Sequence, residues 1–245
     1  MRPGGICVSI FLTAILLLGA GEATAAAIAN WSKSARSWNN SHMTKIRAAM
    51  LTAGHRVEGD GTINNTALKA SSVYLIGEPT ATPIAAELAA LRQFVTEGGV
   101  ILLFADTGID LPTYNNLLAG IGSTIAFIPT TIGTTSALAD GQFTQGPSKI
   151  SGSTLSVTSG NGTTGGTLID NNYVRYEPIG AGYVFVFGDR LDHNDVISDT
   201  NTKLLLNVVS IAAEPPLQIP AVSPAGLLLL GLLLAGVAPV LRRRQ

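Results

Sequence analysis

The sequence predicts an α/β domain built around a mostly parallel β-sheet. Residues 72–76 form a short β-branched and apolar run. Residues 83–97 carry apolar side chains spaced four, three and four apart, which is one face of an α-helix. Residues 100–105 are apolar without alternation, as expected of a parallel strand covered on both faces, and a second fully apolar run follows at 183–187. Strand, helix and strand in this order predict a right-handed βαβ unit.

A further helix is predicted ahead of this unit. Met43, Ile46 and Met50 lie on one helical face, and a glycine follows that can end the helix. Residues 55–58 are a short strand candidate. A clear strand before this helix is missing unless residues 27–31 supply it.

Two tryptophans, Trp31 and Trp38, stand in the polar segment 30–40. With their Asn and Ser neighbours they could stack on sugars. Packing of this segment against the sheet is the interpretation that we favour.

Two more helices are predicted after the βαβ unit. The first contains Tyr114, Leu117 and Ile121 on one face and ends at a glycine. The second runs over about 201–213 and stops at two consecutive prolines.

The region 123–182 is rich in Gly, Ser, Thr and Asn, with short alternating runs between turns. This pattern predicts a β-rich insertion of hairpins and loops beside the parallel sheet. Within it, we expect residues 160–166 to be a solvated and poorly ordered loop.

The charge and cysteine content exclude some classes of function. Without the two terminal segments, 11 basic and 15 acidic residues remain, a net charge of −4. No basic stripe is left to meet a phosphate backbone, so we expect no nucleic-acid binding. The single cysteine, Cys7, lies in the N-terminal segment, so the rest of the chain has no thiol nucleophile and no disulfide.

Residues 1–27 are predicted to be a secretory signal peptide. Arg2 gives a short positive region, residues 6–18 are apolar, and residues 23–25 fit the small-x-small rule for cleavage. Ala26 and Ala27 are neighbouring options for the cleavage site. A retained membrane anchor is the alternative.

The C-terminal segment 217–245 has the features of a membrane anchor. Residues 225–241 are apolar apart from glycines and one proline, and they are just long enough to span a bilayer. The arginines that follow predict a cytoplasmic end, with the folded domain 28–216 outside. A buried core helix is the alternative.

This tail resembles the C-terminal sorting signals of the PEP-CTERM group of bacterial surface proteins and their IPTL-CTERM relatives. The resemblance lies in a proline-containing motif, an apolar helix and a terminal arginine cluster, although the Pro-Glu-Pro triplet is absent and Ala225 stands where an aromatic residue is common. It implies processing by an exosortase-type protease and release or attachment at the cell surface. The corresponding residues are Pro220, Ser223, Pro224, Arg242, Arg243 and Arg244.

The core resembles the class I glutamine amidotransferase-like α/β fold, which has a flavodoxin-like sheet, in its non-catalytic branch. The resemblance runs from about residue 43 to 213, with markers at 53–55, at the βαβ unit and at 180–189. Catalytic members need a thiolate on a sharp turn after a strand, with a histidine partner. The corresponding turn here, residues 105–108, has no cysteine, so the resemblance does not imply amidotransferase chemistry.

The candidate ligand or cation site consists of carboxylates that follow the predicted strands. Asp106 and Asp189 each follow an apolar strand, and ligands of open α/β sheets bind beyond the carboxyl ends of the strands. We expect them either to face a common crevice, where they would orient a ligand or hold a cation, or to fix their own loops.

A second group of oxygen ligands lies in the loop after the last strand. Calcium binds six to eight such oxygens, but the spacing is not that of an EF-hand, and a solvated loop is the alternative. The group consists of Asp189, Asp192, Asn194, Asp195 and Asp199.

These features together predict an exported, surface-sorted α/β domain that binds a partner and has no catalytic activity. By resemblance, the partner is expected in the cell envelope or among extracellular glycans. Two alternatives stay open: a hydrolase that uses Asp106, Asp189 and His193 with or without a cation, and a plain membrane-anchored protein.

Overall fold

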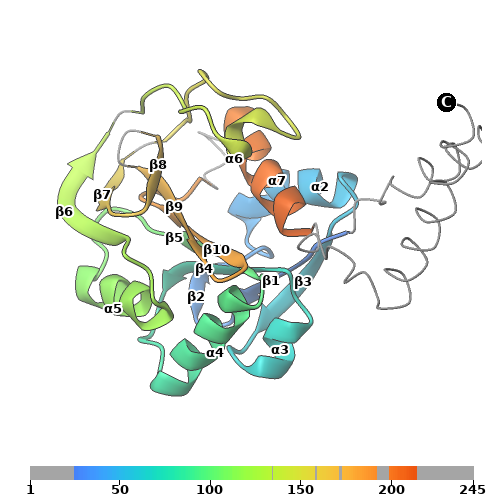
Figure 1. The fold of residues 1–245 in the computed structure, drawn as a ribbon, viewed down its shortest axis with the longest axis vertical. Helices are drawn as coiled ribbons and strands as arrows, with labels where there is room; N and C mark the ends of the chain where they lie inside the picture. Colours follow the sequence, from blue (N-terminus) through green and yellow to red (C-terminus); the bar gives the residue numbers. More distant parts are fainter. Residues whose placement is uncertain (1–24, 134, 158, 171–172, 192–198, 214–245) are drawn as a thin grey trace, which may run out of the picture. The chain divides into compact units, whose positions relative to one another are not determined.

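The computed structural model describes residues 25–133, 135–157, 159–170, 173–191 and 199–213 (Figure 1). Its centre is an eight-stranded sheet in the order β3-β1-β4-β5-β10-β9-β8, with β2 paired to β4 off this path. The first five strands in this order are parallel to one another, and β9, β8 and β2 pair antiparallel with their neighbours. The strands are β1 (Ala27–Trp31), β2 (Ser34–Arg36), β3 (Arg56–Gly61), β4 (Val73–Pro79), β5 (Val100–Phe104), β8 (Thr167–Asp170), β9 (Val174–Ile179) and β10 (Gly182–Phe187).

Helices cover both faces of this sheet, as the sequence predicts. One face packs against α3 (Asn65–Lys69), α4 (Ala85–Thr96) and α5 (Leu111–Ile121). The other packs against the short helix η1 (Ser41–Met43), α2 (Thr44–Thr52), α6 (Gln142–Gln145) and α7 (Asp199–Ala213). Each face has its own cluster of buried apolar side chains, so the sheet separates two hydrophobic cores.

The continuous apolar run of β5 is explained by these two cores. Ile101 and Leu103 belong to the cluster beneath α4 and α5, whereas Leu102 and Phe104 belong to the cluster on the opposite face. All four side chains are fully buried. A strand in this position has no solvent-facing side, which is why its sequence shows no alternation.

The N-terminal segment supplies the missing first strand. β1 lies between β3 and β4 and is buried along its whole length. Trp31 and Trp38 are both fully buried, and Trp38 Nε1 donates to the carbonyl of Ala29 at 3.1 Å. Packing against the sheet is therefore the correct interpretation of the two tryptophans, and sugar stacking by them is wrong because neither ring has exposed surface.

The Gly/Ser/Thr-rich region forms strands, but one expectation for it is wrong. β6 (Ala126–Ile132) and β7 (Gly160–Thr164) make a separate two-stranded sheet, and β8 and β9 extend the main sheet. Residues 160–163 are buried rather than solvated. Gly160 packs so closely on the chain at Gly188 that a Cβ would lie 2.1 Å from its carbonyl oxygen. The glycine in this segment permits close contact between two chain segments.

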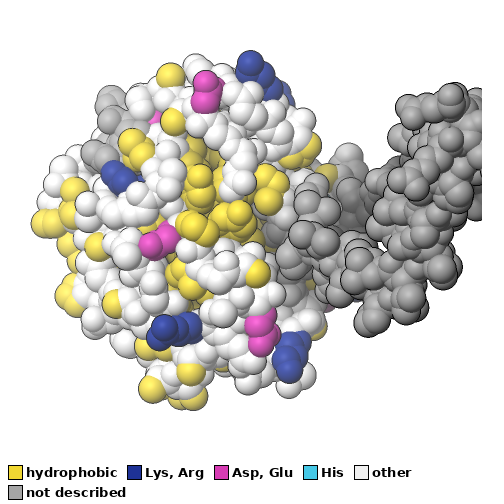
Figure 2. Space-filling model, in the orientation of Figure 1, with side chains coloured by type: hydrophobic (Ala, Val, Ile, Leu, Met, Phe, Trp, Pro, Cys, Tyr) yellow, Lys and Arg dark blue, Asp and Glu magenta, His cyan; other side chains and the backbone are white. Residues whose placement is uncertain are grey.

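Apolar side chains also reach the surface on the side of α6 and α7. Figure 2 shows hydrophobic atoms in a hollow on this face of the molecule. The partly buried Tyr176, Tyr183, Leu206 and Ile211 pack against the core cluster of this side of the sheet.

The predicted terminal segments lie largely outside the described residues. The predicted membrane helix, residues 225–241, is not among them. Within the described ranges, no helix is both long enough and apolar enough to cross a bilayer. At the N-terminus, Ala26 and Ala27, which the sequence places at the end of the signal peptide, are part of the folded sheet.

Candidate functional site

The carboxyl ends of β4, β5 and β10 lie side by side, because these three strands are parallel neighbours. A cavity of about 490 Å³ opens beyond β4 and β5, between the loops that lead into α4 and α5. Its lining includes Glu78, Asp106 and Asp110 together with four threonines, residues 80, 82, 107 and 113. We call this cavity the carboxyl-edge crevice.

Two arginines neutralise two of the carboxylates of the crevice. Arg36 Nε lies 3.1 Å from Glu78 Oε1. Arg190 Nη1 lies 3.3 Å from Asp106 Oδ2 and 3.8 Å from Glu78 Oε1. These four side chains are only 16–26% exposed, so solvent weakens their attraction less than it does for a surface pair. The result is an electrically balanced network that joins β2, β4, β5 and β10.

Glu78 has an unusual backbone conformation at this edge. Its φ is +49°, and among the described residues it is the one non-glycine position with positive φ. Such a conformation costs of order 1 kcal/mol or more and tends to occur at ligand-binding positions. The preceding Gly77 lies so close to β2 that a Cβ would be 2.7 Å from Arg36 Cβ. The close approach of β2 and the positive φ therefore occur at neighbouring residues near the end of β4, beside the ion-paired carboxylate.

The rim of the crevice is built from hydroxyl and carboxylate groups that contact one another. Thr113 Oγ1 donates to Asp110 Oδ2 at 2.7 Å, and it lies 3.4 Å from the hydroxyl of Thr82. The backbone N–H of Thr107 donates to Asp106 Oδ1 at 2.6 Å. These contacts orient the rim groups, and their hydroxyl and carboxylate oxygens can also form hydrogen bonds with a ligand.

Tyr114 lies at the floor of the crevice. Its hydroxyl donates to the carbonyl of Phe104 at 3.4 Å, and the residue is 3% exposed. Burial, together with the negative charges of Glu78 and Asp106, raises the pKa of Tyr114 far above its ordinary value. The phenol stays protonated at neutral pH and so contributes a fixed donor rather than a base.

The structure separates the two aspartates that the sequence places at strand ends. Asp106 lines the crevice, whereas Asp189 is fully buried and does not. Burial and the adjacent carboxylate of Asp189 raise the pKa of Tyr173. Of the two alternatives that the sequence leaves open, this arrangement favours the one in which the two aspartates do not share a crevice. A ligand or cation role for either aspartate stays a prediction.

The candidate calcium loop falls mostly outside the described residues. Asp192, Asn194 and Asp195 lie there, and so does His193. Asp199 is described; its side chain is 95% exposed and lies 3.6 Å from Lys203 Nζ within α7. The described ranges contain no group of three acidic, His or Cys side chains placed to hold a metal ion. Calcium binding stays a prediction of the sequence.

Sequence reasoning missed Glu78, Arg36 and Arg190. The rule for strand ends applied equally to Glu78, but the apolar run of β4 stops two residues earlier, at Ile76. The sequence carries no signal for Arg36, because it lies on a short strand that pairs with β4 across 42 residues of chain.

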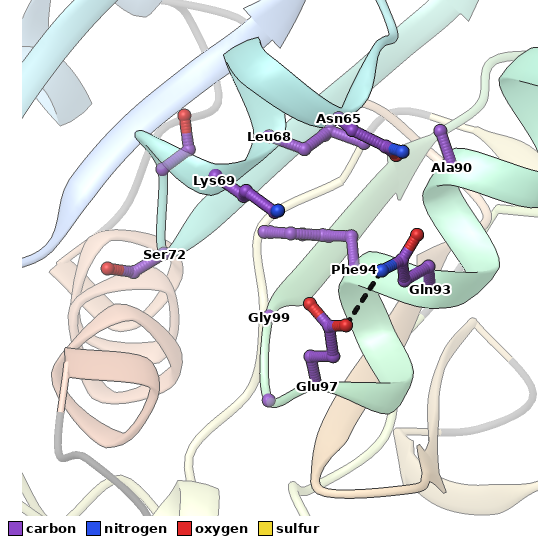
Figure 3. A pocket seen from close by; sticks show the side chains of 11 residues that line it. Asn65, Leu68, Lys69, Ser72, Ala90, Gln93, Phe94, Glu97 and Gly99 are labelled. Atoms are coloured by element: carbon purple, nitrogen blue, oxygen red, sulfur yellow. Dashed lines mark hydrogen bonds between the residues drawn. The ribbon is translucent and has the colours of Figure 1, made fainter.

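A second cavity, of about 260 Å³, lies at the opposite edge of the sheet between α3 and α4 (Figure 3). Lys69 reaches toward it from α3, and Glu97 from the end of α4, with Phe94 between them. Gln93 Nε2 donates to Glu97 Oε1 at 2.8 Å. Lys69, Gln93 and Glu97 are all exposed, and we call this cavity the amino-edge cavity.

Comparison with known proteins supports the fold alone. No protein-family model matches the sequence, and no curated protein matches it. Among solved structures, the mmIFT52 N-terminal domain is similar at 13% identity with a TM-score of 0.61, over 75% of this chain and 95% of that one. A β-galactosidase from Bacillus circulans sp. alkalophilus is similar at 10% identity with a TM-score of 0.52. That match covers 79% of this chain but only 32% of the β-galactosidase.

Proposed function

We propose that this chain is an exported α/β domain that binds a neutral, hydroxyl-rich ligand, such as a glycan of the cell envelope, in the carboxyl-edge crevice. The observation that carries this proposal is the strained Glu78, held by two arginines at the mouth of a polar cavity. A strained backbone conformation persists where the surrounding structure holds it in place, and such positions cluster at functional sites.

The charges of the crevice favour a neutral ligand. Glu78 and Asp106 are balanced by Arg36 and Arg190, and Asp110 adds a further negative charge at the rim. A phosphate or an acidic sugar would meet net negative charge there. Hydroxyl groups of a neutral glycan can donate to the carboxylates and accept from threonine hydroxyls, which satisfies both partners.

The same contacts argue against a hydrolytic role for these carboxylates. A general base needs a carboxylate oxygen that is free to reach the proton it abstracts. Glu78 Oε1 and Asp106 Oδ2 are instead paired with Arg36 and Arg190. Asp189, the second carboxylate of the hydrolase hypothesis, has no exposed surface.

Export and surface sorting form the second part of the proposal. They rest on the signal-peptide pattern of the N-terminal segment and on the proline motif, apolar stretch and arginines of residues 217–245. The tail would hold the chain in the membrane until an exosortase-type protease cuts it near Ser223. The crevice would then face the envelope or the extracellular space, where glycans are the abundant hydroxyl-rich partners.

Titration of the purified protein with soluble glycans tests the binding role. We expect dextran, laminarin or mannan to bind, and the acidic glycan alginate to bind at least about tenfold more weakly because of the net negative rim. Asp110→Asn should weaken binding by removing the charge, while its amide oxygen can still accept the hydrogen bond from Thr113 Oγ1.

Glu97→Gln, in the amino-edge cavity, is the matched control and should bind as the unaltered protein does. An equal loss of glycan affinity in both variants, or tighter binding of alginate than of the neutral glycans, would contradict the assignment of the ligand to the crevice.

Cell fractionation with intact-mass measurement tests export and sorting. We expect the surface or secreted fraction to contain a chain whose intact mass places its C-terminus near Ser223. A chain that keeps Gln245 in the membrane fraction would indicate a plain anchor, and a chain found only in the cytoplasm would overturn export.

A further inference from the structure

The start of β1 is fixed by three hydrogen bonds at the amino edge of the sheet. Arg56 N donates to the carbonyl of Ala26 at 2.9 Å, and Ser72 N donates to the carbonyl of Ala27 at 2.7 Å. The backbone N–H of Ala26 donates to His55 Nδ1 at 3.3 Å. Ala26 is fully buried and Ala27 is 9% exposed, whereas Ala25 is exposed. The chain thus changes from solvent to sheet between residues 25 and 26.

This arrangement distinguishes the alternative ends of the signal peptide. Cleavage after Ala26 would remove the acceptor of Arg56 N. Cleavage after Ala27 would also remove the acceptor of Ser72 N and the first paired residue of β1. Each lost partner would leave a backbone N–H of β3 or β4 without its acceptor at the amino edge of the sheet. Cleavage after Ala25 removes none of these groups, and it also meets the small-x-small rule with Ala23 and Ala25.

We infer that the signal peptide is cut between Ala25 and Ala26, and that the new N-terminal amino group then binds His55. The inference rests on the proposed export of the chain. Hydrolysis adds one water across the Ala25–Ala26 amide: the leader leaves with the carboxylate of Ala25, and the amino group of Ala26 takes up a proton. The ammonium group can donate a hydrogen bond to His55 Nδ1, as the amide N–H of Ala26 does in the uncut chain.

His55 is suited to receive this group. The residue is 8% exposed, and burial lowers the pKa of its imidazole, so the ring is neutral at pH 7 and Nδ1 can accept. Its Nε2 is buried with no hydrogen-bond partner among the described residues. Among the described residues, the hydrogen-bond partner of the imidazole ring is therefore the backbone N–H of Ala26, where the proposed mature chain begins.

The same geometry fixes the order of maturation. A peptidase binds several residues in extended form on both sides of the bond that it cuts. Ala26 and Ala27 are already buried between β3 and β4 in the folded domain. Cleavage must therefore precede the docking of β1, and completion of the sheet follows removal of the leader.

N-terminal mass analysis of the protein from its native host tests the cleavage site. We expect a chain that begins at Ala26. A chain that begins at Thr24, Ala27 or Ile28 would overturn this inference but leave export standing. A chain that keeps Met1 would overturn export and this inference together.

Two variants of the leader sharpen this test. Ala25→Leu should block cleavage, because the residue before the cut must be small. Thr24→Leu, at a position without a size requirement, is the matched control and should be cut normally. Normal cleavage of the Ala25 variant at the same bond would overturn the assignment.

The order of events is tested with the full-length precursor and purified signal peptidase. The precursor unfolded in urea and then diluted into the assay should be cut at least about tenfold faster than the folded precursor, because the folded site opens only through local unfolding. Equal rates for the two samples would overturn the proposed order. The folded precursor must first be shown to be folded by its circular dichroism spectrum.

Discussion

The two edges of the parallel sheet differ in how their polar groups are held. At the carboxyl edge, Glu78, Arg36, Arg190 and Asp106 form one partly buried ion network, and Glu78 is held at φ +49°. At the amino edge, Lys69 and Glu97 are exposed, and Glu97 has an ordinary φ of −84°. Fixed and strained groups gather on the side where α/β sheets bind ligands. At the amino edge, the start of β1 pairs with β3 and β4.

The largest expected difference between the edges is in the free energy of unfolding. Glu78→Ala leaves two partly buried guanidinium groups without their shared partner and should cost about 2 kcal/mol. Glu97→Ala removes one exposed side chain and should change stability by less than about 0.5 kcal/mol. Urea unfolding measures both.

Glycine at the same two positions sharpens this test. Glu78→Gly should be more stable than Glu78→Ala by about 1 kcal/mol, because glycine adopts positive φ freely. At Glu97, where φ is negative, the order of the two variants should reverse. If the alanine variant were more stable than the glycine variant at both positions, Glu78 would not be strained.

A smaller effect is expected for Arg190→Lys. Arg190 Nη1 lies near both Glu78 and Asp106, and a lysine ammonium is more strongly hydrated and sits on a flexible stem, so holding it at the same point costs more. The variant should lose about 1 kcal/mol of stability and most of its glycan affinity. Lys69→Arg, at the amino edge, should change neither quantity. Unaltered binding by the Arg190 variant would separate the ion network from the ligand site.

The smallest expected effect is a dependence of stability on pH at the amino edge. The folded-state pKa of His55 is below its ordinary value, so the unfolded chain binds the proton more readily. The contribution of His55 should be fully present above about pH 6.5 and be lost as the pH falls through the lowered pKa.

His55→Gln keeps a possible acceptor for Ala26 but cannot titrate, so this part of the pH dependence should disappear. Melting temperatures between about pH 5 and pH 8 measure it. An unchanged profile in the variant would assign the acid sensitivity to other groups.

The fold was predictable where the sequence of a single element reflects its surroundings. Residues 100–105 are apolar on both faces because two cores meet at β5, and that pattern alone predicts a central parallel strand. The buried strand β7 was not predictable, because glycine is typical of both loops and close chain contacts. Only the proximity of Gly160 and Gly188, distant in sequence, distinguishes the two cases.

The candidate site was predictable in its location but not in its members. The rule that ligands bind beyond the carboxyl ends of strands selects Asp106, which lines the crevice; its role in ligand binding stays a prediction. The same rule selects Asp189, which is fully buried and does not line the crevice. A side chain just past a strand can point outward or inward, and the sequence does not distinguish the two. Arg36 and Arg190 enter the site through tertiary contacts that no local pattern encodes.

Hydrogen exchange with and without a bound glycan tests the central proposal most directly. The neutral glycan that binds best in the titration would be added to the full chain, and amide protection would be mapped by mass spectrometry. Increased protection at residues 78–84 and 106–114, with no change at 65–72 and 93–99, is the predicted result. Protection confined to the amino edge, or none at either edge, would contradict a ligand site in the carboxyl-edge crevice.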